Sequence, residues 1–165
     1  GGTIAAPVGG QILSEILPYL GVDPKYSDEE LASMAVRIPS VTGQGIETAK
    51  NMIKSQKLTY KIIGNGDTVV KQFPTAAESI YSDGVVILYT ESPDTVEKVT
   101  VPDFSGLTVS GVKTLAAKNN INVQFSGASL TQSGVVSYKQ SIQKDTETDA
   151  GTIITVYFRT TETAE

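Results

Sequence analysis

The chain contains the same segment twice, and this duplication constrains its fold more than any other feature. The first copy starts at Val36 and the second at Val99, so the numbering offset between the copies is 99 − 36 = 63. Apolar positions agree at this offset, and so do four turn or surface residues: Pro39 with Pro102, Gly43 with Gly106, Lys50 with Lys113, and Gly64 with Gly127. An internal period of this size indicates a small domain present in two copies. Tandem copies are more typical of modules that bind or space than of catalytic sites.

The composition argues against several kinds of chemistry. The 165 residues include no cysteine and no histidine, so disulfides, thiolate catalysis and the commonest general base are absent. The net charge is −5, and neither copy carries a basic stripe with interleaved aromatic residues. We therefore expect no nucleic-acid partner. We also expect no cofactor.

Each copy has the pattern of one amphipathic helix followed by three strands. Apolar residues spaced by three and four predict the helix, and alternating or β-branched runs predict the strands. The expected helices cover residues 44–56 and 107–119. The expected strands cover residues 58–63, 69–73 and 85–90 in the first copy, and 121–125, 135–140 and 152–158 in the second. The fold class is α+β, with each helix packed on a three-stranded, largely antiparallel sheet.

The domain organisation follows from this pattern. Residues 36–90 form the first domain and residues 99–160 the second, and the polar segment 91–98 links them. Residues 1–35 contain a further helix, over 7–20, and a connector. No apolar run approaches the roughly 20 residues that span a bilayer. The chain begins with Gly-Gly and without methionine, so we interpret it as a fragment whose targeting signals lie elsewhere.

Few residues suggest a ligand site. Lys71 and Gln72 in the first copy, and Tyr138 and Gln140 in the second, lie near the corresponding strand and are candidates for ligand contact. Ordinary exposed strand residues would give the same pattern. No catalytic residue is predicted.

Two loops contain residues of the types that bind ions. The acidic group Asp145, Glu147 and Asp149 has oxygen ligands of the kind that calcium uses, but it lacks the EF-hand spacing and also fits a solvated acidic loop. We predict no metal site there. The Gly64-Asn65-Gly66 turn has the composition of an anion-binding backbone loop and equally that of a hairpin turn.

The repeated unit resembles the PASTA domain. The resemblance rests on the Val-Pro start, the glycine turn, the helix and the strands, and on the run Val69-Val70-Lys71-Gln72-Phe73-Pro74 followed by Asp83-Gly84 and a closing apolar strand. Ile142 stands in the second copy where Pro74 stands in the first. PASTA domains occur in penicillin-binding proteins and in the extracellular part of bacterial Ser/Thr kinases.

The N-terminal segment, residues 1–22, distinguishes these two parents. Its sequence, GGTIAAPVGGQILSEILPYLGV, resembles the end of the transpeptidase domain of class B penicillin-binding proteins, which are peptidoglycan D,D-transpeptidases. The motifs Ser-x-Asn and Lys-Thr-Gly, which that active site needs, do not occur in this sequence. The resemblance thus implies a C-terminal region without enzymatic activity of its own.

The resemblance also implies a function and a location. We expect a non-catalytic binding or docking module of an enzyme that cross-links peptidoglycan in division or sporulation. Its partners would be peptidoglycan or muropeptides, weakly bound, the absent transpeptidase domain, and proteins of the division or sporulation machinery. It would lie on the extracytoplasmic face of a bacterial cell, tethered by a membrane anchor elsewhere in the parent. The alternative is the muropeptide-sensing ectodomain of a Ser/Thr protein kinase.

Overall fold

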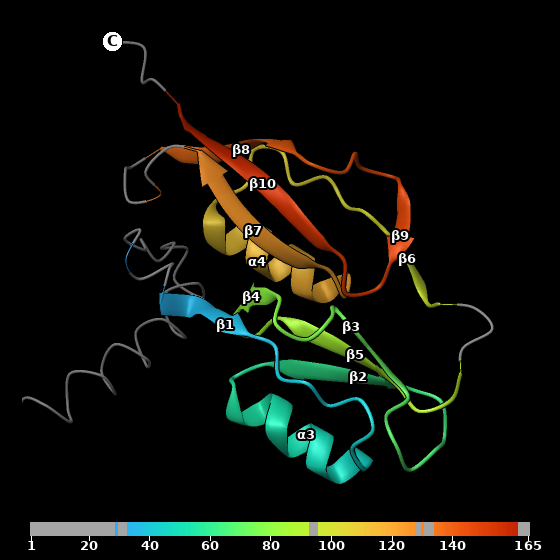
Figure 1. The fold of residues 1–165 in the computed structure, drawn as a ribbon. Coiled ribbons are helices and arrows are strands. Elements are labelled where there is room, and N and C mark those ends of the chain that lie inside the picture. Colours follow the sequence, from blue (N-terminus) through green and yellow to red (C-terminus); the bar gives the residue numbers. More distant parts are fainter. Residues whose placement is uncertain (1–28, 30–32, 93–95, 128–129, 131–133, 162–165) are drawn as a thin grey trace, which may run out of the picture.

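The computed structural model describes residues 29, 33–92, 96–127, 130 and 134–161. Within this part of the chain, two units follow one another, each with a short strand, a helix and four further strands (Figure 1). The first unit comprises β1 (Ala35–Arg37), α3 (Ile46–Ser55), β2 (Thr59–Ile63), β3 (Lys71–Phe73), β4 (Ser79–Tyr81) and β5 (Val85–Tyr89). The second comprises β6 (Lys98–Thr100), α4 (Val109–Lys118), β7 (Asn122–Gly127), β8 (Val135–Gln140), β9 (Glu147–Asp149) and β10 (Ile153–Thr160). The helix predicted over residues 7–20 lies outside the described residues.

The two units have the same strand order. Their three-stranded sheets are β2-β5-β3 and β7-β10-β8, and the remaining strands pair as β1-β4 and β6-β9. The strand after the helix runs parallel to the last strand, and the other pairings are antiparallel. Four of the six pairings in the described part are therefore antiparallel, which agrees with the predicted α+β fold. In each unit the chain forms the far edge strand before it returns along the middle of the sheet, and this long connection permits the parallel pair.

Both predicted helices are present, and each begins two positions later than expected. Gly45 and Thr108 have extended backbone conformations and act as N-caps. The hydroxyl of Thr108 accepts a hydrogen bond from the Gly111 N–H at 3.2 Å, which satisfies one of the free donors of the first turn. The predicted apolar stripes are the buried faces of the helices. These faces consist of Ala49 and Ile53 in α3, and of Val109, Val112 and Ala116 in α4.

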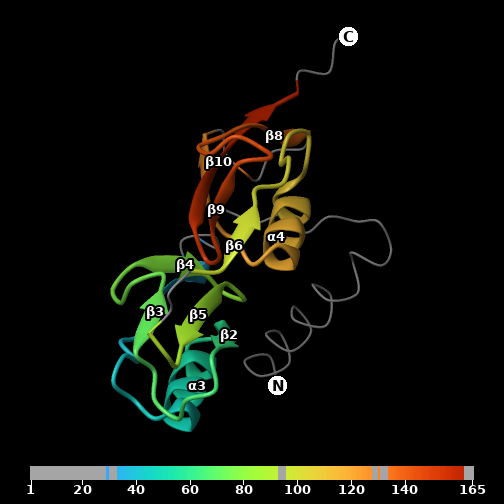
Figure 2. The same ribbon diagram turned by 90° about the vertical axis from the view of Figure 1, so that its right-hand side faces the viewer.

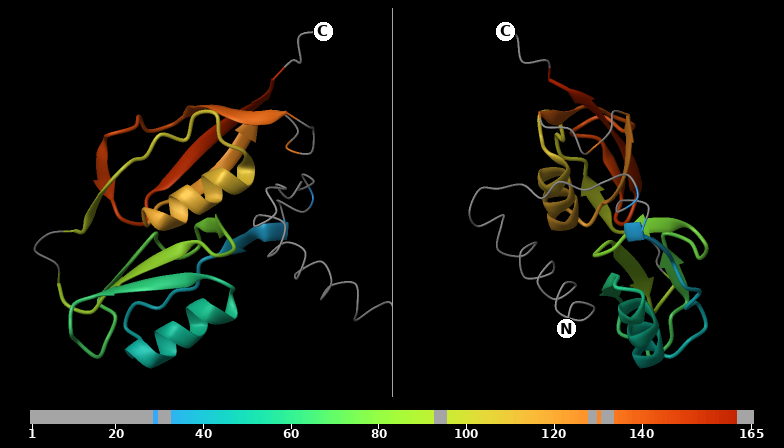
Figure 3. Two further views of the ribbon diagram at one scale, coloured as in Figure 1. Left: turned by 180° about the vertical axis from the view of Figure 1, so that it is seen from behind. Right: turned by 90° about the vertical axis from the view of Figure 1, so that its left-hand side faces the viewer.

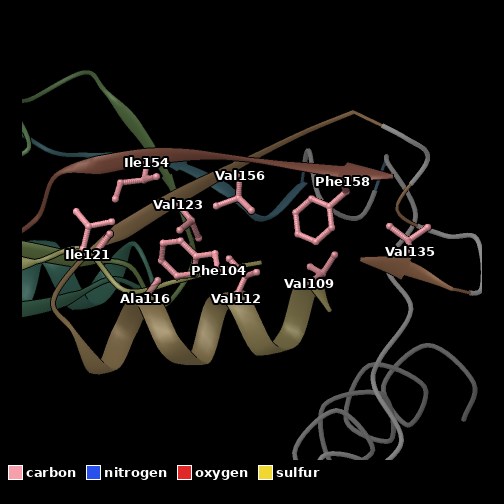
Figure 4. Close-up of a cluster of buried hydrophobic side chains, with 11 residues drawn as sticks. Phe104, Val109, Val112, Ala116, Ile121, Val123, Val135, Ile154, Val156 and Phe158 are labelled. Atoms are coloured by element: carbon pink, nitrogen blue, oxygen red, sulfur yellow. The ribbon is translucent and has the colours of Figure 1, made fainter. Parts of the chain in front are cut away.

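Each helix packs on its own sheet over an apolar core. Figure 4 shows the core of the second unit, where side chains from α4 point toward those of β7 and β10. Phe104, from the segment before the helix, fills the space between them and is 1 % exposed. The first unit has an equivalent cluster that contains Ile38, Val41, Ala49, Ile53, Leu58, Val69, Ile80, Val86 and Leu88. Each unit therefore buries a hydrophobic cluster of its own.

The second unit covers the outer face of the first sheet, the face turned away from α3. Val85, Ile87 and Tyr89 point to this face and form a cluster with Ala150 of the second unit, against which Val99 packs. All five residues of β5 are consequently buried. A strand that is covered on both faces reads as a continuous apolar run, and the sequence Val85-Val86-Ile87-Leu88-Tyr89 has that form.

Hydrogen bonds also join the two units. Asn122, at the start of β7, is 2 % exposed. Its Oδ1 accepts a hydrogen bond from the Val85 N–H at 2.9 Å, and its Nδ2 donates to the carbonyl oxygens of Val85 at 2.9 Å and Gly151 at 2.8 Å. Nearby, the rings of Tyr81 and Phe125 stack with their centroids 4.8 Å apart. Figures 2 and 3 show the resulting contact between the units from other directions.

The numbering offset between equivalent positions changes within the repeat. For the helices, which start at Ile46 and Val109, it is 109 − 46 = 63. In the sheets, Gln72 faces Leu88, and Gln140 faces Val156. The offset there is 140 − 72 = 68, so the second unit has a longer connection between the strand after its helix and the next strand. The structural equivalent of Lys71 is therefore Lys139, which precedes Gln140 as Lys71 precedes Gln72.

Candidate functional site

Two of the four predicted contact residues hold the segments that lead into the helices. Gln72 Oε1 accepts a hydrogen bond from the Val41 N–H at 2.7 Å, and Nε2 donates to the Pro39 carbonyl at 3.0 Å. Gln140 repeats this arrangement with the Phe104 N–H at 2.9 Å and the Pro102 carbonyl at 3.1 Å. The amide groups of both side chains are thus used inside the protein. We assign Gln72 and Gln140 a structural role, and ligand contact at these positions stays a prediction.

A lysine and a tyrosine face each other across equivalent strands in both units. Lys71 faces Tyr89, with its ammonium nitrogen 5.7 Å from the centre of the ring. Lys139 faces Tyr157 in the same way, at 5.3 Å. A cation over an aromatic ring is attracted by the negative face of the ring, which contributes roughly 0.5–1 kcal/mol at an exposed site.

The surroundings of the two tyrosines differ. Tyr89 is completely buried because the second unit covers this face of the first sheet. Tyr157 occupies the equivalent position in the second sheet and is half-buried. The neighbouring residue of the covered face, Ile87, is replaced by Thr155 at the equivalent position (155 − 87 = 68). The second sheet therefore presents a more polar version of the face that the first sheet buries.

We call the group formed by Tyr138, Lys139, Tyr157 and Arg159 the cation–aromatic face; Tyr157 is half-buried and the other three residues are exposed. Tyr138 is 46 % exposed, and the Arg159 guanidinium carbon lies 5.3 Å from the centre of its ring. These residues belong to β8 and β10, on the opposite side of the sheet from the core residues Val156 and Phe158, whose side chains point toward α4 (Figure 4). Exposed aromatic rings stack on the apolar faces of sugars, and cations attract carboxylates. The arrangement suits an anionic carbohydrate.

The structure thus divides the four predicted residues between two sheets. Tyr138 lies in the cation–aromatic face, while Lys71 lies on the exposed edge of the first unit. The sequence analysis missed Lys139 and Arg159. A signal in the sequence could have found both. Lys139 precedes Gln140 as Lys71 precedes Gln72, which makes the two lysines equivalent positions. Arg159 follows Tyr157 by two residues, so both side chains point to the same face of the strand.

The motifs of a transpeptidase active site are incomplete in this sequence. The pattern Ser-x-x-Lys occurs at residues 110–113 and 141–144, but the other two active-site motifs are missing from the sequence. Among the described residues there is no group of three potential metal ligands. Glu147 and Asp149 of the acidic group lie in β9 and not in a loop, and Asp149 pairs with Lys98 at 2.5 Å. In the same part of the chain, no helix is long and apolar enough to cross a bilayer.

Comparison with known proteins agrees with the repeated architecture. The PASTA domain family matches residues 36–92 and 99–160, which is most of the chain. Stage V sporulation protein D from Bacillus subtilis is 28 % identical over 102 residues. That alignment covers 59 % of this chain but 16 % of the sporulation protein, so the chain corresponds to a small part of that relative.

Two solved structures that align with this chain are a penicillin-binding protein and part of a Ser/Thr kinase. Penicillin-binding protein 2X from Streptococcus thermophilus aligns at 19 % identity and a TM-score of 0.33, over 76 % of this chain and 17 % of that one. The three-PASTA-domain part of a Ser/Thr kinase from Staphylococcus aureus aligns at 21 % identity and a TM-score of 0.34, over 74 % of this chain and 64 % of that one.

Proposed function

This chain belongs to the PASTA domain family, and on that premise we propose that it is a non-catalytic C-terminal module of a bacterial penicillin-binding protein that cross-links peptidoglycan. Its role is to hold the parent enzyme on the cell wall or on a partner protein during division or sporulation. The similarity to a sporulation protein supports this assignment, and so does the resemblance of residues 1–22 to the end of a transpeptidase domain. The proposed location is the extracytoplasmic face of the cell.

The open cation–aromatic face is the observation that carries the proposal. The protein has a net charge of −5, yet this face carries two cations, Lys139 over the ring of Tyr157 and Arg159 over the ring of Tyr138. Peptidoglycan combines sugar rings with carboxylates, so it matches both kinds of side chain. Each contact is exposed to solvent and therefore weak. We expect binding in the millimolar to high micromolar range, with Lys71 as a secondary contact.

Co-sedimentation with insoluble peptidoglycan tests this role. The wild-type chain should sediment with the polymer, and Tyr138→Ala and Arg159→Gln should each weaken binding by about fivefold. Lys54→Gln is the matched control, because Lys54 also lies over a tyrosine ring, Tyr60 at 5.6 Å, but on α3. Equal binding by all variants would refute the role of the face, and absence of wild-type binding would refute the proposed affinity for the cell wall.

A second experiment tests the non-catalytic assignment. The chain should not be covalently labelled by fluorescent penicillin, because no Lys-Thr-Gly or Ser-x-Asn accompanies either Ser-x-x-Lys pattern. Labelling that is lost in Ser110→Ala or Ser141→Ala would contradict the assignment.

The kinase-ectodomain alternative is tested by the coding sequence upstream of Gly1. A Lys-Thr-Gly motif some tens of residues before it supports the transpeptidase parent, whereas an apolar span supports the kinase.

A further inference from the structure

The joint between the two units includes a contact between two strand edges. β4 of the first unit pairs with β1 along one edge and meets β7 of the second unit with its other edge. The side chain of Gln124 in β7 donates a hydrogen bond to the Ser79 carbonyl at 3.3 Å. The Phe125 N–H donates to the Tyr81 hydroxyl at 3.4 Å. The outer edges of β4 and β7 are therefore used inside the chain.

Each unit has both of these edges, so one copy of each stays open. β2 is the equivalent of β7, and β9 is the equivalent of β4. Within the described part of the chain, β2 pairs only with β5, and β9 pairs only with β6. Figure 1 shows β4 at the joint, with β9 at the right-hand side of the second unit and β2 low in the first. The first unit thus presents one half of the internal contact, and the second unit presents the other half.

The open edge of the first unit is basic where its equivalent is neutral. Ala117 and Gln124 line the joint on the side of the second unit. Their equivalents in the first unit are Lys54 and Lys61 (117 − 54 = 63 and 124 − 61 = 63). Lys61 pairs with Glu97 at 2.5 Å, whereas Lys54 is exposed and leaves a net positive charge there. We call β2 together with these two lysines the basic edge.

The open edge of the second unit is acidic where its equivalent is neutral. Ser79 and Tyr81 line the joint on the side of the first unit. Their equivalents in the second unit are Glu147 and Asp149 (147 − 79 = 68 and 149 − 81 = 68). Asp149 pairs with Lys98 at 2.5 Å, whereas Glu147 is exposed and takes part in no ion pair among the described residues. We call β9 together with these two acids the acidic edge.

We propose that the acidic edge of one molecule docks on the basic edge of a second copy of this chain, in the arrangement that β4 and β7 have at the internal joint. Because Gln124 bonds to Ser79 there, Lys61 would lie beside Glu147 of the other copy. The contact is heterologous, since each molecule contributes a different edge, so further copies can add end to end. This self-association goes beyond the proposed function and does not depend on it.

Attraction between charges has to stabilise this contact, because two anchors of the internal joint are changed. Thr59 stands at the position of the buried Asn122 (122 − 59 = 63). Thr155 stands at the position of Ile87 (155 − 87 = 68). The contact between copies therefore lacks a buried amide and an apolar side chain. We expect it to be weaker than the internal joint and sensitive to salt, which screens exposed charges.

The docked arrangement leaves most of the cation–aromatic face accessible. Val70 and Lys71 are the equivalents of Tyr138 and Lys139 (138 − 70 = 68 and 139 − 71 = 68). Both stay exposed although the second unit covers the first sheet. Of the face, docking would cover mainly Tyr157. Self-association and binding at that face are therefore separable.

Sedimentation velocity of the full chain tests the contact. At about 20 mM sodium chloride, the weight-average mass should rise with protein concentration and exceed that of a dimer at millimolar protein. At about 500 mM sodium chloride, the dissociation constant should increase by about tenfold. A chain that stays monomeric at low salt, or an association that persists unchanged at high salt, would overturn the proposal.

Two variants identify the two edges. Lys54→Glu reverses a charge of the basic edge and Glu147→Lys a charge of the acidic edge, and each should weaken self-association by about tenfold. An equimolar mixture of the two variants retains one intact basic edge and one intact acidic edge, so it should form dimers with the affinity of the wild-type contact. A mixture that stays as monomeric as each variant alone would refute the pairing of these edges.

Lys71→Glu is the matched control. It makes the same change of charge as Lys54→Glu, but on β3, at the opposite edge of the first sheet from β2. This variant should associate like the wild type, and loss of association in it would show that net charge, not the basic edge, controls the contact. Circular dichroism melting of each variant checks that the exposed substitutions leave the fold intact. If one of them unfolds the protein, the salt series on the wild-type chain still decides.

Discussion

Gln72 and Gln140 make the same pair of hydrogen bonds to the two segments that lead into the helices, one to a backbone N–H and one to a proline carbonyl. Each amide also donates to the carbonyl of the second residue after it, Pro74 at 3.5 Å or Ile142 at 2.7 Å. A buried amide that satisfies three backbone groups at once fixes the position of the segment. The repeat is therefore stabilised at the same point in both units.

Replacing Gln72 by alanine should destabilise the protein by about 1–3 kcal/mol, because the Val41 N–H loses its buried partner. Gln140→Ala should cost less, since this side chain is only half-buried. Urea unfolding followed by circular dichroism measures both changes. The exposed Gln143 provides the control substitution, which should be close to neutral. A Gln72→Ala variant as stable as the control would contradict the structural role.

Asn122→Ala should loosen the joint between the units. The substitution leaves the N–H and carbonyl of Val85 without their partner, at a cost of about 1–3 kcal/mol. We expect the two units to tumble more independently in ¹⁵N relaxation measurements. Gln124→Ala is the control, because this exposed side chain makes one longer bond across the joint, to Ser79 at 3.3 Å. Unchanged relaxation in the Asn122 variant would show that apolar packing alone holds the joint.

A reciprocal exchange tests the difference between the two outer faces. Ile87→Thr places a hydroxyl in the covered face of the first sheet and should cost about 2 kcal/mol, since the hydroxyl loses water and the apolar contact is reduced. Thr155→Ile, the opposite exchange at the equivalent open position, should leave thermal stability nearly unchanged. It enlarges an exposed apolar patch, so sedimentation should detect self-association. Equal losses of stability in both variants would mean that both faces are covered.

Acid should weaken the ion pair between Lys144 and Asp103 in the second unit. The hydrogen bond from Lys144, at 2.9 Å, and then those from Ser105 hold the pKa of Asp103 well below its usual value. Because the folded-state pKa is the lower one, this contact stabilises the protein fully above the pKa of an ordinary aspartate, about 3.9, and is lost as the pH falls from there through the folded-state value. A carboxyl ¹³C titration of Lys144→Gln should show the pKa of Asp103 moving up. The exposed Lys118→Gln should not move it.

The sequence predicted the repeated unit well because its evidence is local. Apolar residues spaced as in Val109, Val112 and Ala116 must lie on one face of a helix, whatever lies opposite. Alternation of apolar and polar residues likewise identified residues 58–63 and 121–125 as half-buried strands. The strands β4 and β9 were missed because each of them is too short for a period to be recognised.

The sequence by itself therefore determined the helices, the main strands and the duplication. Periodicity shows which side of an element is apolar, and turn residues show where an element ends. Only the tertiary structure decided what covers each side. It buried Tyr89 and left Tyr157 half-open, gave Gln72 internal partners, and brought Asp83 and Lys113 into one cleft although they belong to different units. Contacts between distant segments depend on the packing of whole units, and no local pattern records them.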